Sequence, residues 1–132
     1  MDKDELKQME NKQNIIKHYF ESWINKDISI IEMYFSQNIK YIECYGPEYN
    51  GIKQIRQWFN DWNNGNNVLK WDIKRFIEYN NIIVVEWFFE CEYKKNVSGF
   101  DGVSIIEFEG DNKIILIKEF QSKTEHTFPY GK

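Results

Sequence analysis

Glu43 is the first candidate for chemistry, because its neighbours along the sequence are aromatic. A strand over about residues 38–45 would place Tyr41, Glu43 and Tyr45 on one face and the intervening residues on the other. If that face looks into a pocket, burial would raise the pKa of the Glu43 carboxyl and make it a usable base near neutral pH. The alternative is a carboxylate at the end of a surface strand, paired with a lysine.

Aromatic side chains are the second notable feature of the sequence. They make up 17% of the chain, with five Trp, eight Tyr and ten Phe. So many large rings in so short a chain must either fill a core or line a cavity. We expect a cavity for an apolar or aromatic ligand, and we expect its ring-bearing residues to include Trp23, Phe59, Trp62, Trp87 and Phe89.

Composition limits the function further. The 132 residues suit one domain, residues 1–132, and the net charge of −4 argues against nucleic-acid binding. No apolar run is long enough to cross a bilayer and no signal peptide is recognisable, so we expect a cytoplasmic protein that does not bind membranes. The two cysteines are expected to be reduced. No metal-ligand spacing and no glycine-rich phosphate loop occurs, so no metal and no cofactor is expected. The absence of alanine and the excess of lysine over arginine suggest a low-GC bacterium.

Hydrophobic periodicity predicts three helices and five strands. Asp27 and Asn50 are suited to cap the second and third helices. The helices are expected at about 3–25, 28–35 and 51–63, and the strands at about 38–45, 68–79, 82–94, 97–109 and 113–124. This order predicts an α+β fold, in which a curved, mostly antiparallel mixed sheet wraps around the three N-terminal helices as a cone with an internal pocket.

Several short segments resemble one known superfamily over about residues 10–128. They are Asn25-Lys26-Asp27-Ile28, Glu43-Cys44-Tyr45-Gly46-Pro47, Asn50-Gly51, Ile55-x-x-Trp58-Phe59, Val85-Glu86-Trp87 and Asn112-Lys113-Ile114. The chain resembles the nuclear-transport-factor-2-like (NTF2-like, cystatin-like) superfamily, in particular its SnoaL-like branch, which shares the cone fold of ketosteroid isomerase. The superfamily contains isomerases, dehydratases, cyclases and non-enzymatic binding domains, so the fold alone implies no activity.

The resemblance implies roles for particular residues. Glu43 falls at the position of the isomerases' proton-shuttling carboxylate, and Tyr19 falls at the position of the tyrosine that donates a hydrogen bond to the substrate oxygen. The isomerases' third element, a protonated acid, is replaced by Ser104, a weaker donor, which argues against steroid isomerisation itself. On the last strand, the resemblance places Gln121 in the cavity with Glu119, where both could orient a polar ligand end. The alternative for these two is ordinary surface alternation.

Three other polar residues are further candidates for a site. Arg75 could pair with a buried carboxylate or bind an acidic ligand, or it could extend into solvent from a strand end. Asp101 and His126 could act together at the mouth of the cone, although a solvated tail histidine is the simpler interpretation. The epoxide-hydrolase branch of the superfamily needs an arginine between two aspartates, and strand 82–94 has no arginine.

Three functions therefore remain open. The first is a cofactor-free isomerase, cyclase or dehydratase that uses Glu43 as a proton-transfer base. The second is a non-catalytic domain that captures a small hydrophobic ligand. The third, compatible with both, is a homodimer formed through the outward face of the sheet, with apolar residues at Val103, Ile105, Leu116 and Phe120.

Overall fold

The computed structural model of the protein describes residues 11–132. Its first described helix, α2 (Lys12–Asn25), begins where the Asn11 side chain accepts a hydrogen bond from the backbone N–H of Asn14. The helix ends at Lys26, whose left-handed backbone conformation closes the last turn. The sequence predicted one helix over 3–25, and the part of it before residue 11 lies outside the described residues.

Two shorter helices follow α2. In α3 (Ser29–Tyr34), the capping residue is Ile28 and no side chain caps the helix, so the prediction that Asp27 caps it is wrong. Asp27 instead accepts hydrogen bonds from the backbone N–H and the hydroxyl of Ser29. In α4 (Ile52–Asn63), the capping residue is Gly51, and no side chain caps the helix. The prediction that Asn50 caps α4 is therefore wrong. Among residues 11–132, none of the helices combines the length and the apolar character needed to cross a bilayer.

The first strand differs most from the sequence prediction. Strand β1 (Phe35–Ile42) starts and ends three residues earlier than expected, and a turn follows it in which the backbone N–H of Glu43 bonds to the carbonyl of Pro47. A short strand that was not predicted, β2 (Glu48–Asn50), then pairs antiparallel with β1. Glu43 thus lies in a turn rather than within a strand, so simple alternation does not decide where it points.

The remaining strands were predicted to within two residues. They are β3 (Asn67–Tyr79), β4 (Ile82–Tyr93), β5 (Asn96–Glu109) and β6 (Lys113–Ser122), with the short 3-10 turn η1 (Gly110–Asn112) before β6. The strand order in the sheet is β2-β1-β6-β5-β4-β3. All neighbours are antiparallel except β1 and β6, which pair in parallel, so the sheet is mixed as expected.

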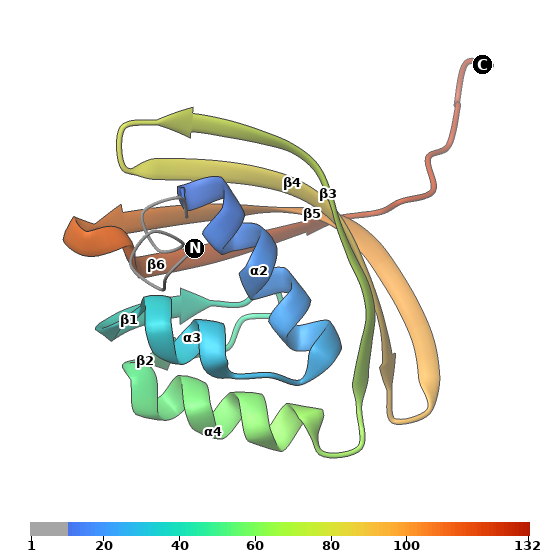
Figure 1. The fold of residues 1–132 in the computed structure, drawn as a ribbon. Helices are drawn as coiled ribbons and strands as arrows, with labels where there is room; N and C mark the ends of the chain where they lie inside the picture. Colours follow the sequence, from blue (N-terminus) through green and yellow to red (C-terminus); the bar gives the residue numbers. More distant parts are fainter. Residues whose placement is uncertain (1–10) are drawn as a thin grey trace, which may run out of the picture.

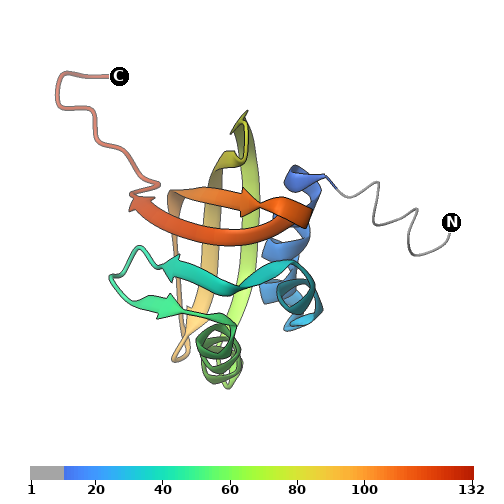
Figure 2. The same cartoon turned by 90° about the vertical axis from the view of Figure 1, so that its left-hand side faces the viewer.

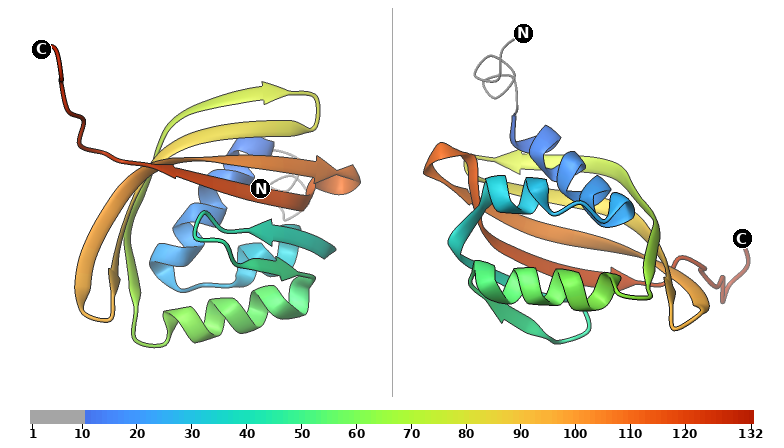
Figure 3. Two further views of the ribbon diagram at one scale, coloured as in Figure 1. Left: turned by 180° about the vertical axis from the view of Figure 1, so that it is seen from behind. Right: turned by 60° about the horizontal axis from the view of Figure 1, so that its bottom comes forward.

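The sheet is strongly curved and the helices lie on its concave side. Strands β3, β4 and β5 bend along their length, and α2 crosses the hollow they form, while α3 and α4 lie beside β1 and β2 (Figure 1, Figure 2). Seen from behind and from below, none of the helices of residues 11–132 lies on the far face of the sheet (Figure 3). Register shifts within β3, between Val68 and Lys70 and between Ile73 and Arg75, help the strand to bend. The α+β cone expected from the sequence is therefore present.

The core occupies the inner part of the hollow, between α2 and the sheet. Its fully buried members come from nearly every element, including Ile15, Phe20, Ile39, Ile55, Ile83, Ile106 and Phe108. On β4, the buried positions Ile83, Val85 and Trp87 alternate with partly exposed ones, as expected for a strand with one covered face. The core fills only part of the cone, and the remainder is open.

Candidate functional site

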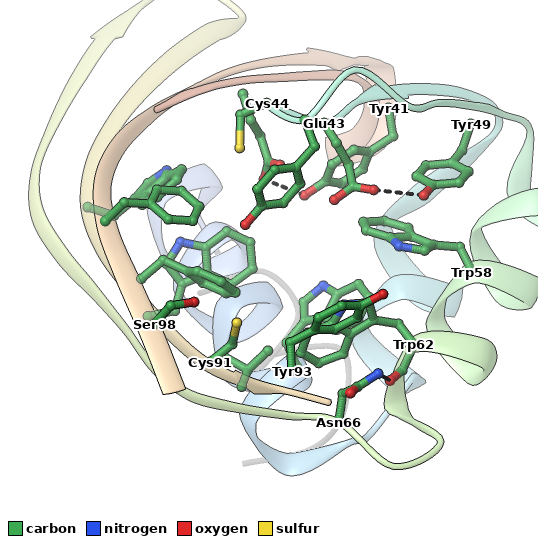
Figure 4. Close-up of a pocket in the computed structure, with 18 of the residues that line it drawn as sticks. Tyr41, Glu43, Cys44, Tyr49, Trp58, Trp62, Asn66, Cys91, Tyr93 and Ser98 are labelled. Atoms are coloured by element: carbon green, nitrogen blue, oxygen red, sulfur yellow. Dashed lines mark hydrogen bonds between the residues drawn. The ribbon is translucent and has the colours of Figure 1, made fainter. Parts of the chain in front are cut away.

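A cavity of about 660 Å³ opens into the wide end of the cone. Eleven of the nineteen residues that line it are aromatic. They come from α2, β1, the turn after β1, β2, α4, β3, β4 and β5, so the cavity exists only when the whole sheet has formed around the helices (Figure 4). Tyr45, Asp61 and Tyr93 are well exposed and mark its mouth. A cavity of this size and composition suits a small, largely apolar molecule.

A chain of hydrogen bonds runs through the wall of the cavity and ends on a carboxyl group. The indole N–H of Trp23 donates to the hydroxyl of Tyr19 (3.0 Å), and the Tyr19 hydroxyl donates to that of Tyr41 (2.7 Å). The Tyr41 hydroxyl donates to Oε2 of Glu119 (2.6 Å). These four side chains are buried, so each donor needs the acceptor that it has.

The carboxyl group of Glu119 is buried away from water. Burial raises its pKa to about 8, although the hydrogen bond from Tyr41 acts in the opposite direction and the nearby charge of Glu43 adds to the rise. At pH 7 most molecules therefore carry a proton on Glu119. Burial also raises the pKa of Tyr19 and Tyr41 well above the usual range, so both hydroxyls remain protonated. Glu119 is thus an acid that can donate a hydrogen bond into the cavity at neutral pH.

Glu43 reaches the same cavity from the turn after β1. Its Oε1 accepts a hydrogen bond from the hydroxyl of Tyr49 on β2 (2.7 Å), and Figure 4 shows the two side chains pointing toward each other. Burial raises the pKa of Glu43, and the bond from Tyr49 opposes the rise. Glu43 is less buried than Glu119, so it is the carboxyl that ionises more readily.

The structure brings six of the ten predicted site residues to the cavity wall. They are Trp23, Glu43, Trp62, Trp87, Phe89 and Glu119. Three others are buried just behind the wall. Tyr19 lies behind Tyr41, Phe59 lies against the ring of Trp23 at 4.6 Å, and Ser104 accepts a hydrogen bond from the indole N–H of Trp87 (2.9 Å). These three residues do not line the cavity, and each contacts a residue that does.

Gln121 does not lie in this cavity. It is exposed near the end of β6, where it pairs with Gly102 of β5, and it lines a second, more open hollow with Phe88, Glu90 and Lys123. The expectation of an inward Gln121 is therefore corrected. Glu119 and Gln121 lie on the same face of β6 by alternation, but the cavity ends between them along the strand. Alternation predicts which face a residue lies on, but it does not predict where along the strand a cavity ends.

Several lining residues were not singled out from the sequence as site residues. Tyr49 was missed because β2 was not predicted, and Cys44 because it was assigned to the far face of a strand. Asp61, Asn66, Cys91 and Tyr93 gave no signal beyond their residue types. Burial raises the pKa of the Cys44 thiol to about 12 and raises that of Cys91, so both thiols are protonated at neutral pH and are poor nucleophiles.

The other polar candidates lie outside the cavity. Arg75 is exposed and pairs with Glu86 (3.2 Å), as in the interpretation of a solvated strand arginine. Asp101 pairs with Lys74 (3.0 Å), and His126 lies in the exposed tail. In the part of the chain that the structure describes, no group of three or more His, Cys, Asp or Glu side chains could hold a metal ion.

Comparison with known families agrees with the geometry. The SnoaL-like domain family matches residues 16–117, which is most of the chain. The chain therefore belongs to the SnoaL-like domain family. No curated protein matches the chain.

Solved structures share the fold at low sequence identity. One is an epoxide hydrolase from M. tuberculosis described as LEH-like, with a TM-score of 0.75, 11% identity and coverage of 84% of this chain and 82% of that one. An NTF2-like protein of unknown function from Burkholderia pseudomallei K96243 has a TM-score of 0.72, 12% identity and coverage of 86% and 92%.

A third solved structure has a ketosteroid isomerase-like fold and comes from Catenulispora acidiphila DSM 44928. It was determined in complex with trimethylamine, and it matches with a TM-score of 0.71, 14% identity and coverage of 83% and 85%. At these identities the three likenesses show the fold alone.

Proposed function

We propose that the protein binds a small hydrophobic or aromatic molecule in the cone and catalyses a cofactor-free proton transfer on it, as an isomerase, cyclase or dehydratase would. The observation that carries this proposal is the presence of two carboxyl groups in one aromatic cavity, at different degrees of burial. When the environments of two carboxyl groups give them different pKa values, one can act as the base and the other as the acid in the same reaction.

The two carboxyls suit complementary roles. Glu43, the less buried one, removes a proton from the carbon next to a carbonyl group, and Tyr49 holds its carboxylate in place. Glu119, which keeps its own proton at neutral pH, donates a hydrogen bond to the oxygen on which negative charge develops. Tyr41, and behind it Tyr19 and Trp23, hold the other oxygen of Glu119. In this scheme Tyr19 is a positioning residue.

A neutral aromatic ketone tests the reaction. 2-Tetralone has exchangeable protons next to its carbonyl and is small enough for the cavity. In D₂O the protein should accelerate the replacement of these protons by deuterium, measured by ¹H NMR against buffer alone. Because a positioned base contributes about 100-fold or more, Glu43→Gln should lose most of the acceleration. The matched control is Glu48→Gln, an exposed carboxylate on β2 that lies outside the cavity.

The alternative function is a ligand-binding domain without catalysis. In that case 2-tetralone would raise the melting temperature of the protein while deuterium exchange stayed at the buffer rate. Exchange that Glu43→Gln leaves unchanged would also exclude Glu43 as the base.

We also propose that the protein forms a homodimer through the outer face of the sheet. No helix covers this face in residues 11–132, and Val103 lies directly opposite Phe120 on it. Val103, Ile105 and Leu116 are partly exposed, and Phe120 is 46% exposed. These apolar residues alternate with Lys118 and Glu86 on the same face, and exposed apolar side chains grouped in this way support association.

A further inference from the structure

We propose that the cavity selects organic cations, namely an apolar or aromatic molecule that carries a substituted ammonium group. This inference rests on the ligand-binding cavity of the proposed function and names the class of ligand that the cavity takes.

The charged residues of the cavity wall are all acidic. Glu43, Asp61 and Glu119 line the cavity, and within residues 11–132 no Lys, Arg or His does so. The ion pairs found between described side chains lie elsewhere, at Arg56–Glu32, Lys74–Asp101 and Arg75–Glu86. Glu119 keeps its proton at neutral pH, so an anionic ligand would meet the carboxylates of Glu43 and Asp61 and no counter-charge. A cationic ligand would supply the counter-charge that the wall lacks.

The aromatic walls favour the same sign of charge. The ring of Trp58 stacks on that of Tyr49 (4.4 Å between centroids, 14° between planes). Trp23 meets Trp62 nearly at a right angle (5.6 Å, 86°), so the indoles present walls in different directions. The face of an aromatic ring is its negative side, and Trp offers the strongest attraction for an ammonium group. Several rings around one space, next to carboxyl groups, are the usual features of a site for alkylated ammonium.

The ammonium group of Lys94 already lies over the face of an aromatic ring at the mouth of the cavity, that of Tyr93. The Nζ atom of Lys94 lies over the ring of Tyr93 at 5.3 Å from its centroid. Lys94 itself does not line the cavity, so it neutralises no carboxyl group inside it. The contact places a cation against one of the rings that line the cavity.

The cavity suits an organic cation better than a metal ion. A metal ion needs several oxygen, nitrogen or sulfur ligands around one point, and no such cluster occurs among the described residues. A substituted ammonium carries its charge on an apolar surface, so it loses less hydration on entering an aromatic site. The volume of about 660 Å³ leaves room for an apolar body attached to the charged group.

A pair of ligands of nearly equal shape tests the charge directly. The cation 3-hydroxyphenyltrimethylammonium and the neutral 3-tert-butylphenol differ mainly in the exchange of a nitrogen for a carbon. Isothermal titration calorimetry on the intact chain at pH 7.5 should give a dissociation constant at least tenfold lower for the cation. Binding of the neutral compound with equal or higher affinity would overturn the inference while leaving the proposed cavity function intact. If neither compound bound, the proposed function would fail together with it.

Variants of the wall extend the test. Glu43→Gln should weaken binding of the cation several-fold and leave 3-tert-butylphenol within about twofold, because only the cation interacts with the charge. Trp58→Leu should also reduce the preference for the cation, since it removes a ring face but keeps an apolar side chain. Glu48→Gln should change neither ligand. Equal losses for both ligands in Glu43→Gln would count against a charge effect. The comparison of ligands on the unmodified protein remains decisive if a variant does not fold.

Discussion

At the level of single residues, the two carboxyl groups of the cavity are held by different partners. Glu43 is bonded by Tyr49 near the mouth, whereas Glu119 is bonded by Tyr41 at the end of a buried relay. Tyr19 donates its hydroxyl proton to Tyr41, and Tyr41 donates its own to Glu119, so neither hydroxyl can also donate a hydrogen bond to a ligand. Glu119 is then the only member of the relay that can donate to a bound oxygen.

The raised pKa of Glu119 makes stability depend on pH. In the unfolded chain this carboxyl loses its proton near its ordinary pKa of 4.5, whereas in the folded protein it keeps the proton up to about pH 8. Between these values the folded state binds more protons, so the free energy of unfolding falls as pH rises. Glu119→Gln cannot ionise, so its melting temperature relative to the unmodified protein should rise steadily from pH 5 to pH 8, measured by thermal unfolding.

The control for this prediction is again an exposed carboxylate. Glu48→Gln should follow the unmodified protein at every pH, because Glu48 is exposed. A constant difference between Glu119→Gln and the unmodified protein across the pH range would show that Glu119 ionises normally in the folded state.

At the level of elements, the long strands and α4 were predictable because their patterns extend over many residues. Trp58 and Phe59 fall on adjacent positions of α4, yet Trp58 lines the cavity and Phe59, which was expected to line it, lies behind Trp23. Periodicity identifies which face is buried, but it does not show how deeply each residue lies. The same limit explains the placement of Tyr19 and Ser104 behind the wall.

The end of β1 could not be predicted for a different reason. The alternation of Tyr41, Glu43 and Tyr45 continues past Ile42, but the backbone turns there, and a hydrogen bond between Glu43 and Pro47 forms the turn. Three-residue strands such as β2 carry too short a pattern to be recognised. Glu43 nevertheless lies among aromatic rings, because the turn directs it toward the cavity.

The close approach of the Trp87 ring to β5 leads to a prediction at this scale. Gly102 leaves room for the ring of Trp87, and an added Cβ would clash with that ring and lie 2.5 Å from the carbonyl oxygen of Phe120. Gly102→Ala should therefore destabilise the protein by roughly 1–3 kcal/mol and displace Trp87 toward the cavity. Urea unfolding measures the first effect and the fluorescence of the tryptophans reports the second.

A matched glycine is available for comparison. Gly110 has no atom within 4 Å of an added Cβ, so Gly110→Ala should stay within about 0.5 kcal/mol of the unmodified protein. If the two substitutions lowered the free energy of unfolding equally, the close approach of Trp87 would not be the reason that position 102 requires glycine.

At the level of the whole molecule, the uncovered face of the sheet leads to a prediction about assembly. Light scattering at micromolar concentration should give twice the chain mass of 16.1 kDa. Replacing both Val103 and Phe120 by lysine should give the single-chain mass, because it places charges at the centre of the proposed contact. Ile24→Lys, at a partly exposed apolar position on α2, should leave the mass unchanged. A single-chain mass for the unmodified protein would contradict the homodimer.

The parallel pairing of β1 with β6 has a consequence for how the protein is made. Tyr41 and Glu119 are separated by 78 residues, and the strand that carries Glu119 is the last to leave the ribosome. Until β6 has been made, the aromatic residues of the cavity lack the part of the wall that β6 supplies. Strand β1 also lacks its neighbour on one side. Such distant pairings form slowly, and exposed apolar intermediates attract chaperones. Synthesis must therefore reach β6 before this domain can acquire its sheet or its complete cavity wall.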